Sequence, residues 1–194
     1  MNSVKAVAVY CGSRKGADPK YVKAAYRLGQ ILAQHHVRLV FGGGSVGLMG
    51  AVSDGVADHK GDAIGVITEN LVRQEVANNR LPVLEVVPSM HVRKQRMFEL
   101  AEAFVVLPGG AGTLDELFEI LTWKLLRLHD RPIVIVDQDG YWQPLVALID
   151  RIIEQGFAAE QLPALYTVVA SVEDVLPALS AEPPPAFPDQ PKRT

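Results

Sequence analysis

Residues 105–119, VVLPGGAGTLDELFE, join a glycine-rich turn to a cluster of acidic side chains. In the turn, Gly109, Gly110 and Gly112 leave backbone N–H groups unobstructed, and the following helix adds partial positive charge at its N-terminus. These features predict a binding site for a phosphate group. No Gly-Lys-Ser/Thr follows, so the turn is not a Walker loop, and it suits a phosphate monoester better than a triphosphate with magnesium.

The acids behind the turn are Asp115, Glu116 and Glu119, where a phosphate site would gain more from a lysine. Thr113-Leu-Asp-Glu116 has the spacing of a capping box, in which the Glu116 carboxylate bonds back to the cap amide. Asp115 and Glu119 fit a solvated helix face with favourable charge near the N-terminus. The loop alone does not decide between capping and a chemical role for Glu116.

A second group of candidate residues lies in PSMHVRKQRM, residues 88–97. At helical spacing, Met90, Arg93, Lys94 and Met97 share one face. Methionines around an Arg-Lys pair indicate an adaptable apolar wall beside fixed positive charge. The alternative is a basic, solvated face next to an ordinary core stripe.

The segment FGGGSVGLMG (41–50) contains Gly42-x-Gly44-x-x-Gly47, which formally matches the dinucleotide fingerprint. The match is weak because the motif follows the second predicted strand, and Asp62 precedes the third strand instead of ending it. We therefore do not expect NAD. The glycines permit either a tight turn with close helix–strand approach or the approach of a phosphate or ribose, and the sequence leaves both open.

Composition narrows the function classes further. Cys11 is the only cysteine, which excludes a disulfide within the chain and a cysteine zinc site. The histidines show no ligand spacing, so we expect neither a metal site nor a cofactor. The net charge of −3 gives no indication of nucleic acid or an anionic membrane as partner. No apolar run suits a secretory signal or a membrane span, so we expect a cytoplasmic protein.

Short β-branched apolar runs alternate with longer amphipathic stretches, and these elements must position the candidate residues. We expect strands at 4–10, 37–41, 63–67, 83–87, 103–107, 132–136 and 166–170, and helices near 19–35, 47–59, 90–101, 113–128, 141–155 and 172–180. Strands that are apolar on both faces are typical of a parallel sheet covered by helices on both sides. The predicted fold class is α/β, a Rossmann-like doubly wound parallel sheet. One domain would span residues 1–180, followed by a Pro-rich, flexible tail at 181–194.

Local signals agree with these elements. Asp18-Pro19 predicts the N-cap and first residue of a helix, and Ser171-Val-Glu-Asp174 has the spacing of a capping box. In such a fold, ligands bind beyond the carboxyl ends of the strands. That rule selects four loops: CGSRKG, GGGSVGLMG, PSMHVRK and PGGAGT.

MHVRK and PGGAGTLDE, sixteen residues apart from Arg93 to Gly109, resemble the LONELY GUY (LOG) family, whose signature is PGGxGTxxE with an upstream MHxRK. The resemblance runs from VYCGSRKG through TWKLLRLHDRP to about residue 180. It implies a homodimeric hydrolase that converts cytokinin riboside 5′-monophosphates, and often AMP, into free base and ribose 5-phosphate. Val92 departs from the acid that many members carry in MHERK, which puts the orientation of Arg93 or the base preference in question.

The resemblance also implies roles for individual residues. Arg93 and Glu116 match the family's catalytic pair. Arg93 can orient that carboxylate, bind phosphate or ribose oxygens, or assist departure of the base, and the sequence does not choose among these roles. The positions that match its nucleotide-binding residues are Lys94, Gly109, Gly110, Gly112, Thr113, Glu75 and Thr122. Met90 is our own addition, because its helix face would contact an apolar N6 substituent of the base.

Hydrolysis of an N-glycosidic bond would give the acidic residue Glu116 a chemical role beside the phosphate site. Cleavage of an N-glycosidic bond builds oxocarbenium character on the ribose, and a carboxylate near the anomeric carbon stabilises that charge or activates water. With the 5′-phosphate at the glycine turn, Glu116 lies about one helical turn away, within the span of a ribose. The alternative is a nucleotide-binding carrier or sensor without turnover, which needs the turn but not Glu116 with Arg93. A pyridoxal-dependent decarboxylase is not expected, because nothing supplies its cofactor pocket.

Overall fold

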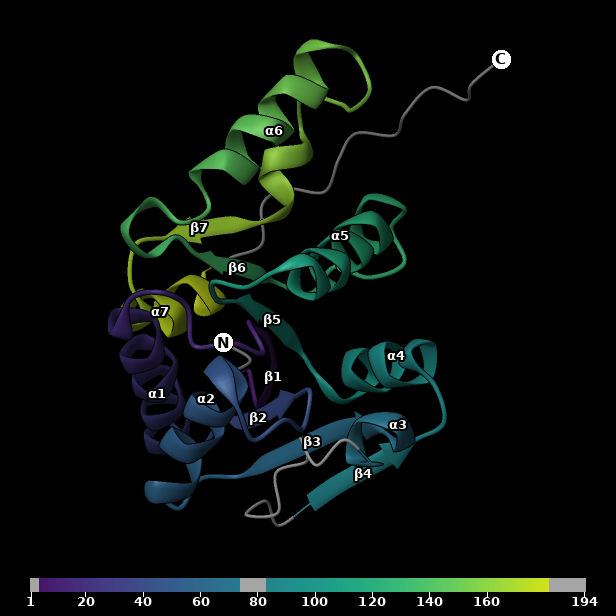
Figure 1. Cartoon of the computed structure of the whole chain (residues 1–194). Helices are drawn as coiled ribbons and strands as arrows, with labels where there is room; N and C mark the ends of the chain where they lie inside the picture. Colours follow the sequence, from purple (N-terminus) through teal and green to yellow (C-terminus); the bar gives the residue numbers. More distant parts are fainter. Residues whose placement is uncertain (1–3, 74–82, 182–194) are drawn as a thin grey trace.

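The computed structural model describes residues 4–73 and 83–181. Its centre is a seven-stranded sheet in which neighbouring strands are parallel, in the order β4-β3-β2-β1-β5-β6-β7 (Figure 1). The strands are β1 (Ala6–Tyr10), β2 (Arg38–Phe41), β3 (Ala63–Thr68), β4 (Val83–Val87), β5 (Ala103–Val106), β6 (Ile133–Val136) and β7 (Thr167–Val169). The predicted doubly wound α/β fold is confirmed.

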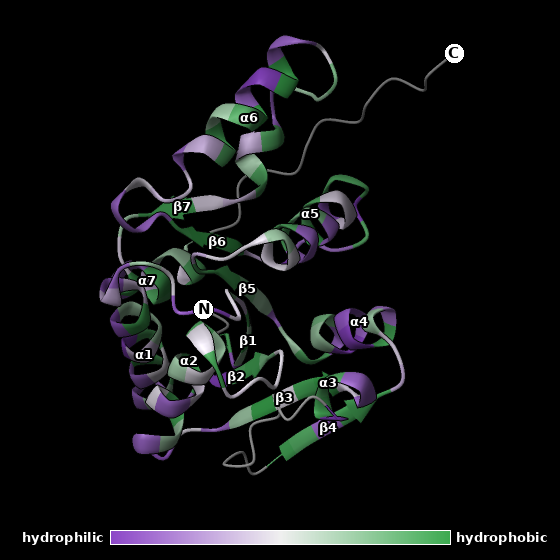
Figure 2. Cartoon of the chain, in the orientation of Figure 1, coloured by the Kyte–Doolittle hydropathy of each residue, from purple (hydrophilic) through white to green (hydrophobic). Residues whose placement is uncertain are grey.

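Helices cover both faces of this sheet. They are α1 (Pro19–Gln34), α2 (Gly47–Asp58), α3 (Glu69–Arg73), α4 (Met90–Leu100), α5 (Ala111–Leu125), α6 (Gln143–Glu154) and α7 (Val175–Ser180), with short 3-10 turns η1 (Gln138–Gly140), η2 (Leu162–Leu165) and η3 (Val172–Asp174). Val7 and Val9 of β1 pack in one core with α1, α2 and α7. Ala8 and Tyr10 pack in a second core with α4, α5 and α6. Both faces of the central strands are therefore buried, as their continuous apolar sequences predict, whereas the edge strands β4 and β7 expose Val83, Val86 and Val168. Polar residues lie on the outer helices (Figure 2).

The strand order explains where a ligand site can form. The chain runs outward from β1 through β2 and β3 to β4, and then returns to the other side of β1 as β5. The connections after β1 and β5 therefore leave in opposite directions and open a crevice at the carboxyl ends of these strands. Tyr10 pairs with Val106, and the N–H of Gly12 donates to the carbonyl of Pro108 over 3.0 Å. The loop after β1 thus lies directly against the glycine turn after β5.

All the predicted strands and helices are present, with ends that differ by up to three residues, and the short 3-10 turns η1 and η2 were not predicted. Three further differences are informative. Helix α3 was missed because none of its five residues is buried, so the sequence carries no apolar periodicity there. The last predicted helix is divided into η3 and α7. Helix α5 begins at Ala111, two residues earlier than expected, and its first helical hydrogen bond joins Leu114 N–H to Gly110 O.

The two capping predictions had different outcomes. Asp18 is confirmed as the N-cap of α1, since its side chain accepts a hydrogen bond from the N–H of Lys20. The capping box at Ser171 is wrong. The Ser171 hydroxyl donates to the Asp174 carboxylate over 2.7 Å, and no side chain caps the 3-10 turn that follows. The two polar side chains satisfy each other instead of the backbone.

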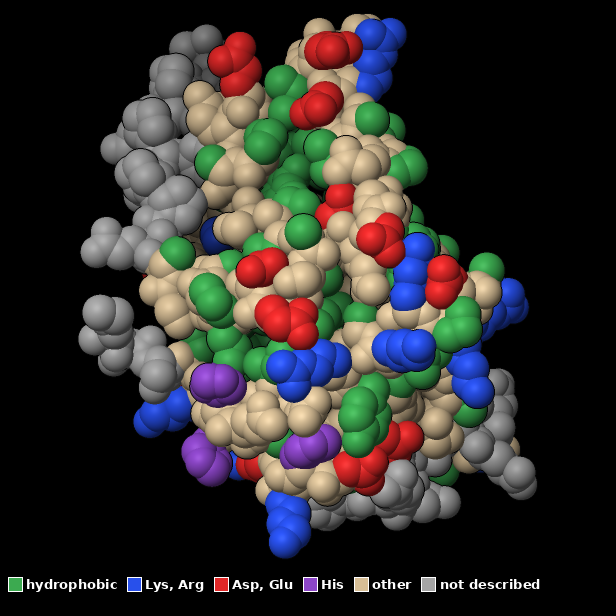
Figure 3. Space-filling view, turned by 90° about the vertical axis from the view of Figure 1, so that its left-hand side faces the viewer, with side chains coloured by type: hydrophobic (Ala, Val, Ile, Leu, Met, Phe, Trp, Pro, Cys, Tyr) green, Lys and Arg blue, Asp and Glu red, His purple; other side chains and the backbone are tan. Residues whose placement is uncertain are grey.

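Acidic and basic side chains are interspersed on the face that carries α1 and α2 (Figure 3), in keeping with a net charge of only −3. Within residues 4–73 and 83–181, no helix is long and apolar enough to cross a membrane. The same residues contain no cluster of three or more His, Cys, Asp or Glu side chains that could hold a metal ion. The Pro-rich segment 182–194 lies outside the described residues.

Candidate active site

A cavity of about 1000 Å³ lies at the carboxyl ends of the central strands. It is lined by the loop after β1, the glycine-rich loop after β2, the first turns of α4 and the PGGAGT turn before α5. The four loops that the fold rule selected from the sequence therefore come together around one cavity. The cavity is large enough for a small-molecule ligand of nucleotide size.

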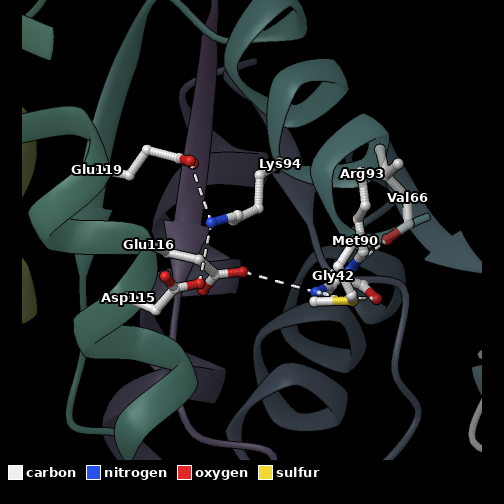
Figure 4. A network of polar contacts seen from close by, with 8 residues as sticks. All are labelled: Gly42, Val66, Met90, Arg93, Lys94, Asp115, Glu116 and Glu119. Carbon is white, nitrogen blue, oxygen red and sulfur yellow. Dashed lines mark hydrogen bonds and ion pairs between the residues drawn. The ribbon is translucent and has the colours of Figure 1, made fainter.

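Arg93 and Glu116 meet at the wall of this cavity (Figure 4). Helix α4 contributes the arginine and α5 the glutamate, and Arg93 Nη1 lies 3.6 Å from Glu116 Oε1. Both side chains are nearly buried, with 8% and 12% of their surfaces exposed. Ser89 begins α4 by accepting the N–H of Val92, which places Arg93 in the first turn, facing inward. The sequence could suggest this pairing only through the resemblance, since 23 residues separate the two positions.

The environment of Glu116 makes its carboxyl group a weaker acid than an exposed glutamate, with a raised pKa. Burial raises the pKa of its carboxyl from 4.5 to about 7, and the neighbouring Asp115 and Glu119 raise it as well. Arg93 and Lys94 act in the opposite direction and limit the rise. A carboxyl group with a pKa near neutrality can hold or release a proton at physiological pH, which general acid–base catalysis requires.

Glu116 does not cap its helix. Gly110 is the N-cap of α5 and no side chain bonds to it, so the capping-box interpretation of Thr113 and Glu116 is wrong. The two residues missing from the predicted helix explain the error, because Thr113 lies inside the first turn and Glu116 in the second. Thr113 is buried, and its side chain fills the space beside Gly109.

The glycine turn has two kinds of glycine. A Cβ added to Gly109 would overlap the Thr113 side chain, whereas one added to Gly110 or Gly112 would meet nothing within 4 Å. The latter two therefore face open space in the cavity wall. The N–H groups of the first turn of α5 have no partners within the helix, and the helix dipole adds positive charge there. The Tyr141 hydroxyl also fixes the turn by donating to the Gly109 carbonyl over 2.6 Å.

Lys94 is already engaged by acids. Its Nζ lies 3.0 Å from an oxygen of Asp115 and 3.1 Å from one of Glu119, and only 11% of its side chain is exposed (Figure 4). Lys94 is not among the residues that line the cavity. The predicted solvated face is observed for Asp115, whose side chain is 60% exposed, but not for Glu119, which is 26% exposed, and both acids also pair with this lysine. The three residues join α4 to α5 and so hold the elements that carry Arg93 and Glu116.

The loop after β1 supplies two cations that the sequence analysis did not assign. Arg14 and Lys15 line the cavity and are exposed. Within the part of the chain that the structure describes, neither forms an ion pair. The fold rule had selected CGSRKG, but one basic pair in a loop carries no spacing signal. Their significance follows only from the contact between this loop and the glycine turn.

The methionine face predicted for α4 lies at the cavity. Met90 and Met97 both line the cavity, Met90 being 46% exposed and Met97 fully buried. Together with Met49, Ile67 and Leu71 they form an apolar wall, which agrees with the expected methionine face.

Two predicted contacts are not brought to the cavity. Thr122 is exposed on α5 and is not among the residues that line it. Glu75 lies outside the described residues.

The second glycine-rich loop packs against protein. Gly47 has a φ of +65°, and a Cβ there would overlap the backbone of Ser13. A Cβ on Gly42 would overlap the guanidinium of Arg93. Of the two interpretations left open, close approach is therefore the one that the contacts favour at these positions.

The fold and the position of the cavity define the class of Rossmann-like α/β proteins that bind ligands at a topological switch point. Residues 49–179 match the protein family described as "Possible lysine decarboxylase". The chain is 40% identical over 178 residues to "Cytokinin riboside 5′-monophosphate phosphoribohydrolase LOG" of Oryza sativa subsp. japonica, covering 88% of this chain and 74% of the relative. It is 42% identical over 153 residues to a cytokinin riboside 5′-monophosphate phosphoribohydrolase of Arabidopsis thaliana, covering 79% and 70%.

Among solved structures, the chain resembles the molybdenum cofactor binding protein from Rippkaea orientalis with a TM-score of 0.69. At 21% identity over 91% of this chain and 96% of that one, this likeness shows the fold alone. The sequence matches are more specific, and they show that the chain belongs to the LOG family.

Proposed function

We propose that this protein hydrolyses the N-glycosidic bond of adenosine 5′-monophosphates, including N6-substituted ones, and releases free base and ribose 5-phosphate. The observation that carries the proposal is the buried Arg93–Glu116 pair, which lies in the wall of the same cavity as the glycine turn. The relatives named above act on cytokinin riboside 5′-monophosphates according to their names. Substrate class and site geometry therefore point to the same reaction.

The turn and the pair divide the work between two parts of the substrate. The N–H groups at Gly110–Thr113 and the dipole of α5 hold the 5′-phosphate, assisted by Arg14 and Lys15. The phosphate is not attacked, so no metal or cofactor is needed there. Binding energy from the phosphate positions the ribose next to Glu116.

Glu116 then acts at the anomeric carbon. As the bond from C1′ to the base breaks, positive charge builds on the ribose, and the carboxylate stabilises it or accepts a proton from the attacking water. Water supplies the new C1′ hydroxyl, and the base leaves with its bonding electron pair and gains a proton. Arg93 favours the ionised form of Glu116, because its positive charge lowers the pKa of that carboxyl.

The apolar wall gives a place for the base. The part of the cavity formed by β3, α2, α3 and α4 is lined by Ile67, Met49, Leu71 and Met90. An apolar N6 substituent would bury its carbons there, at about 25 cal/mol per Å² of apolar area removed from water.

We also propose a cytoplasmic homodimer whose folded domain ends near residue 180. The family resemblance supports the dimer, and Thr122, exposed outside its own cavity, is available to a partner subunit. Light scattering after size-exclusion chromatography tests this directly: the expected mass is twice 21.1 kDa.

A carrier or sensor of nucleotides would share the glycine turn but would not turn substrate over. The test is incubation with AMP and with N6-isopentenyladenosine 5′-monophosphate, followed by chromatography for the free base and ribose 5-phosphate. Equimolar release of both products is expected. Saturable binding without release of base would favour the carrier, and addition of pyridoxal phosphate should produce no absorbance typical of a Schiff base.

A further inference from the structure

The Arg93 guanidinium is held from the side opposite Glu116. Its Nε donates to the carbonyl of Val66 over 2.9 Å, and its Nη2 donates to the carbonyl of Gly42 over 3.1 Å. Figure 4 shows these carbonyls on one side of the guanidinium and Glu116 on the other. Backbone carbonyls within β3 and directly after β2 therefore fix the orientation of a side chain that belongs to α4.

Gly42 contributes empty space as well as a carbonyl. An ideal Cβ at this position would overlap Nη2 of Arg93, and it would lie 3.1 Å from Cζ and 2.9 Å from the sulfur of Met49. The φ of Gly42 is not in the left-handed region, so its backbone conformation is open to any residue. What excludes a side chain is the space that the guanidinium and the methionine occupy.

We infer that Gly42 is a positioning residue for the hydrolysis. Because glycine has no Cβ, the Arg93 guanidinium can occupy the space next to the Gly42 backbone from which it reaches Glu116. This inference rests on the proposed function. Gly42→Ala forces the guanidinium away from the Gly42 carbonyl and changes its 3.6 Å relation to Glu116. A displacement of about 1 Å in an active site can cost roughly 10²-fold in rate. The glycine turn at residues 109–113 is not touched by the substitution, so the loss should fall on kcat and not on KM.

A double-mutant cycle separates positioning from a general effect on the site. We expect Gly42→Ala to lower kcat for release of adenine from AMP by roughly 10²-fold, and to lower it no further in an Arg93→Ala background. KM should stay within about threefold in each case. An equal loss in both backgrounds would contradict the inference, because Gly42 would then act without Arg93.

The double variant also tests the fold. In Arg93→Ala the guanidinium is gone, and of the three nearest contacts of the added Cβ only the one at 2.9 Å to the sulfur of Met49 remains, which a flexible methionine side chain relieves by moving. The double variant should therefore unfold at or above the melting temperature of Arg93→Ala alone, even if Gly42→Ala by itself does not fold. Failure of both Gly42→Ala and the double variant to fold would show that the clash involves other atoms, and the inference would be wrong.

Gly44→Ala is the matched comparison in the same loop. Its φ is also outside the left-handed region, and the three atoms nearest to its added Cβ all belong to Met49, whose terminal methyl lies 3.0 Å away and can move. The NMR signal of the Arg93 Nε–H, hydrogen-bonded to Val66, reports the position of the guanidinium without any turnover. It should shift or exchange faster in Gly42→Ala and remain in Gly44→Ala. An unchanged signal in Gly42→Ala contradicts this inference, whereas a wild-type protein that releases no base contradicts the proposed function.

Discussion

The ionised carboxylate of Glu116 should lower the free energy of unfolding at neutral pH, because burial disfavours its charge. The variant Glu116→Gln measures the size of this effect. The carboxyl ionises near 4.5 in the unfolded chain and near 7 in the folded one. Between these values the folded state binds more protons, so the free energy of unfolding falls as the pH rises through this window. A difference of about 2.5 pKa units corresponds to about 3 kcal/mol. The cost is absent below pH 4.5, where both states are protonated, and complete above pH 7, where both are ionised.

The assay is urea unfolding of wild type and Glu116→Gln at pH 4.5, 6 and 8. Any constant difference between a protonated glutamate and a glutamine cancels when the values at different pH are compared. Relative to wild type, Glu116→Gln should gain up to about 3 kcal/mol between pH 4.5 and 8. Glu154→Gln is the control, because its carboxylate is 64% exposed. If the difference between wild type and Glu116→Gln stayed constant across this range, Glu116 would not be held as a weak acid.

Two further predictions concern charges around the pair and the phosphate. Lys94→Met removes a positive charge that lowers the pKa of Glu116, so the acidic limb of the pH profile of kcat/KM should move to higher pH. An acidic limb that does not move would show that Lys94 has no electrostatic influence on the reaction. Arg14→Ala with Lys15→Ala should raise KM for AMP about tenfold, equal to about 1.4 kcal/mol, and reduce the salt dependence of KM, with kcat little changed. Lys60→Ala, an exposed lysine after α2, is the control, and equal effects of both changes on KM would refute a local role.

The fold could be predicted because its signals are local and repeated. Each strand carries a short apolar run, and both faces of the central strands are buried, so no alternation had to be interpreted there. Helix α3 escaped prediction because it buries nothing. The early start of α5 escaped prediction because Gly110 and Gly112 flank Ala111 and glycine is a poor helix former. That error led directly to the wrong capping box at Thr113.

The site was harder to predict because its contacts join distant parts of the chain. Arg93 and Glu116 could be placed together only through the family resemblance, and nothing in the sequence showed that Lys94 pairs with Asp115 and Glu119. The significance of Gly42 depends on a guanidinium that arrives from 51 residues further along the chain. Such contacts depend on the packing of α4 between β3 and α5, which no local pattern records.

The most direct measurement of the central claim is kcat for release of free base from AMP by wild type, Arg93→Ala, Glu116→Ala and the exposed control Glu154→Ala. The account predicts that Arg93→Ala and Glu116→Ala each lose at least about 10²-fold in kcat while remaining folded. Glu154→Ala should match wild type, since its side chain is exposed on α6 and pairs with Arg151. Turnover by Glu116→Ala or Arg93→Ala close to that of wild type would contradict the account.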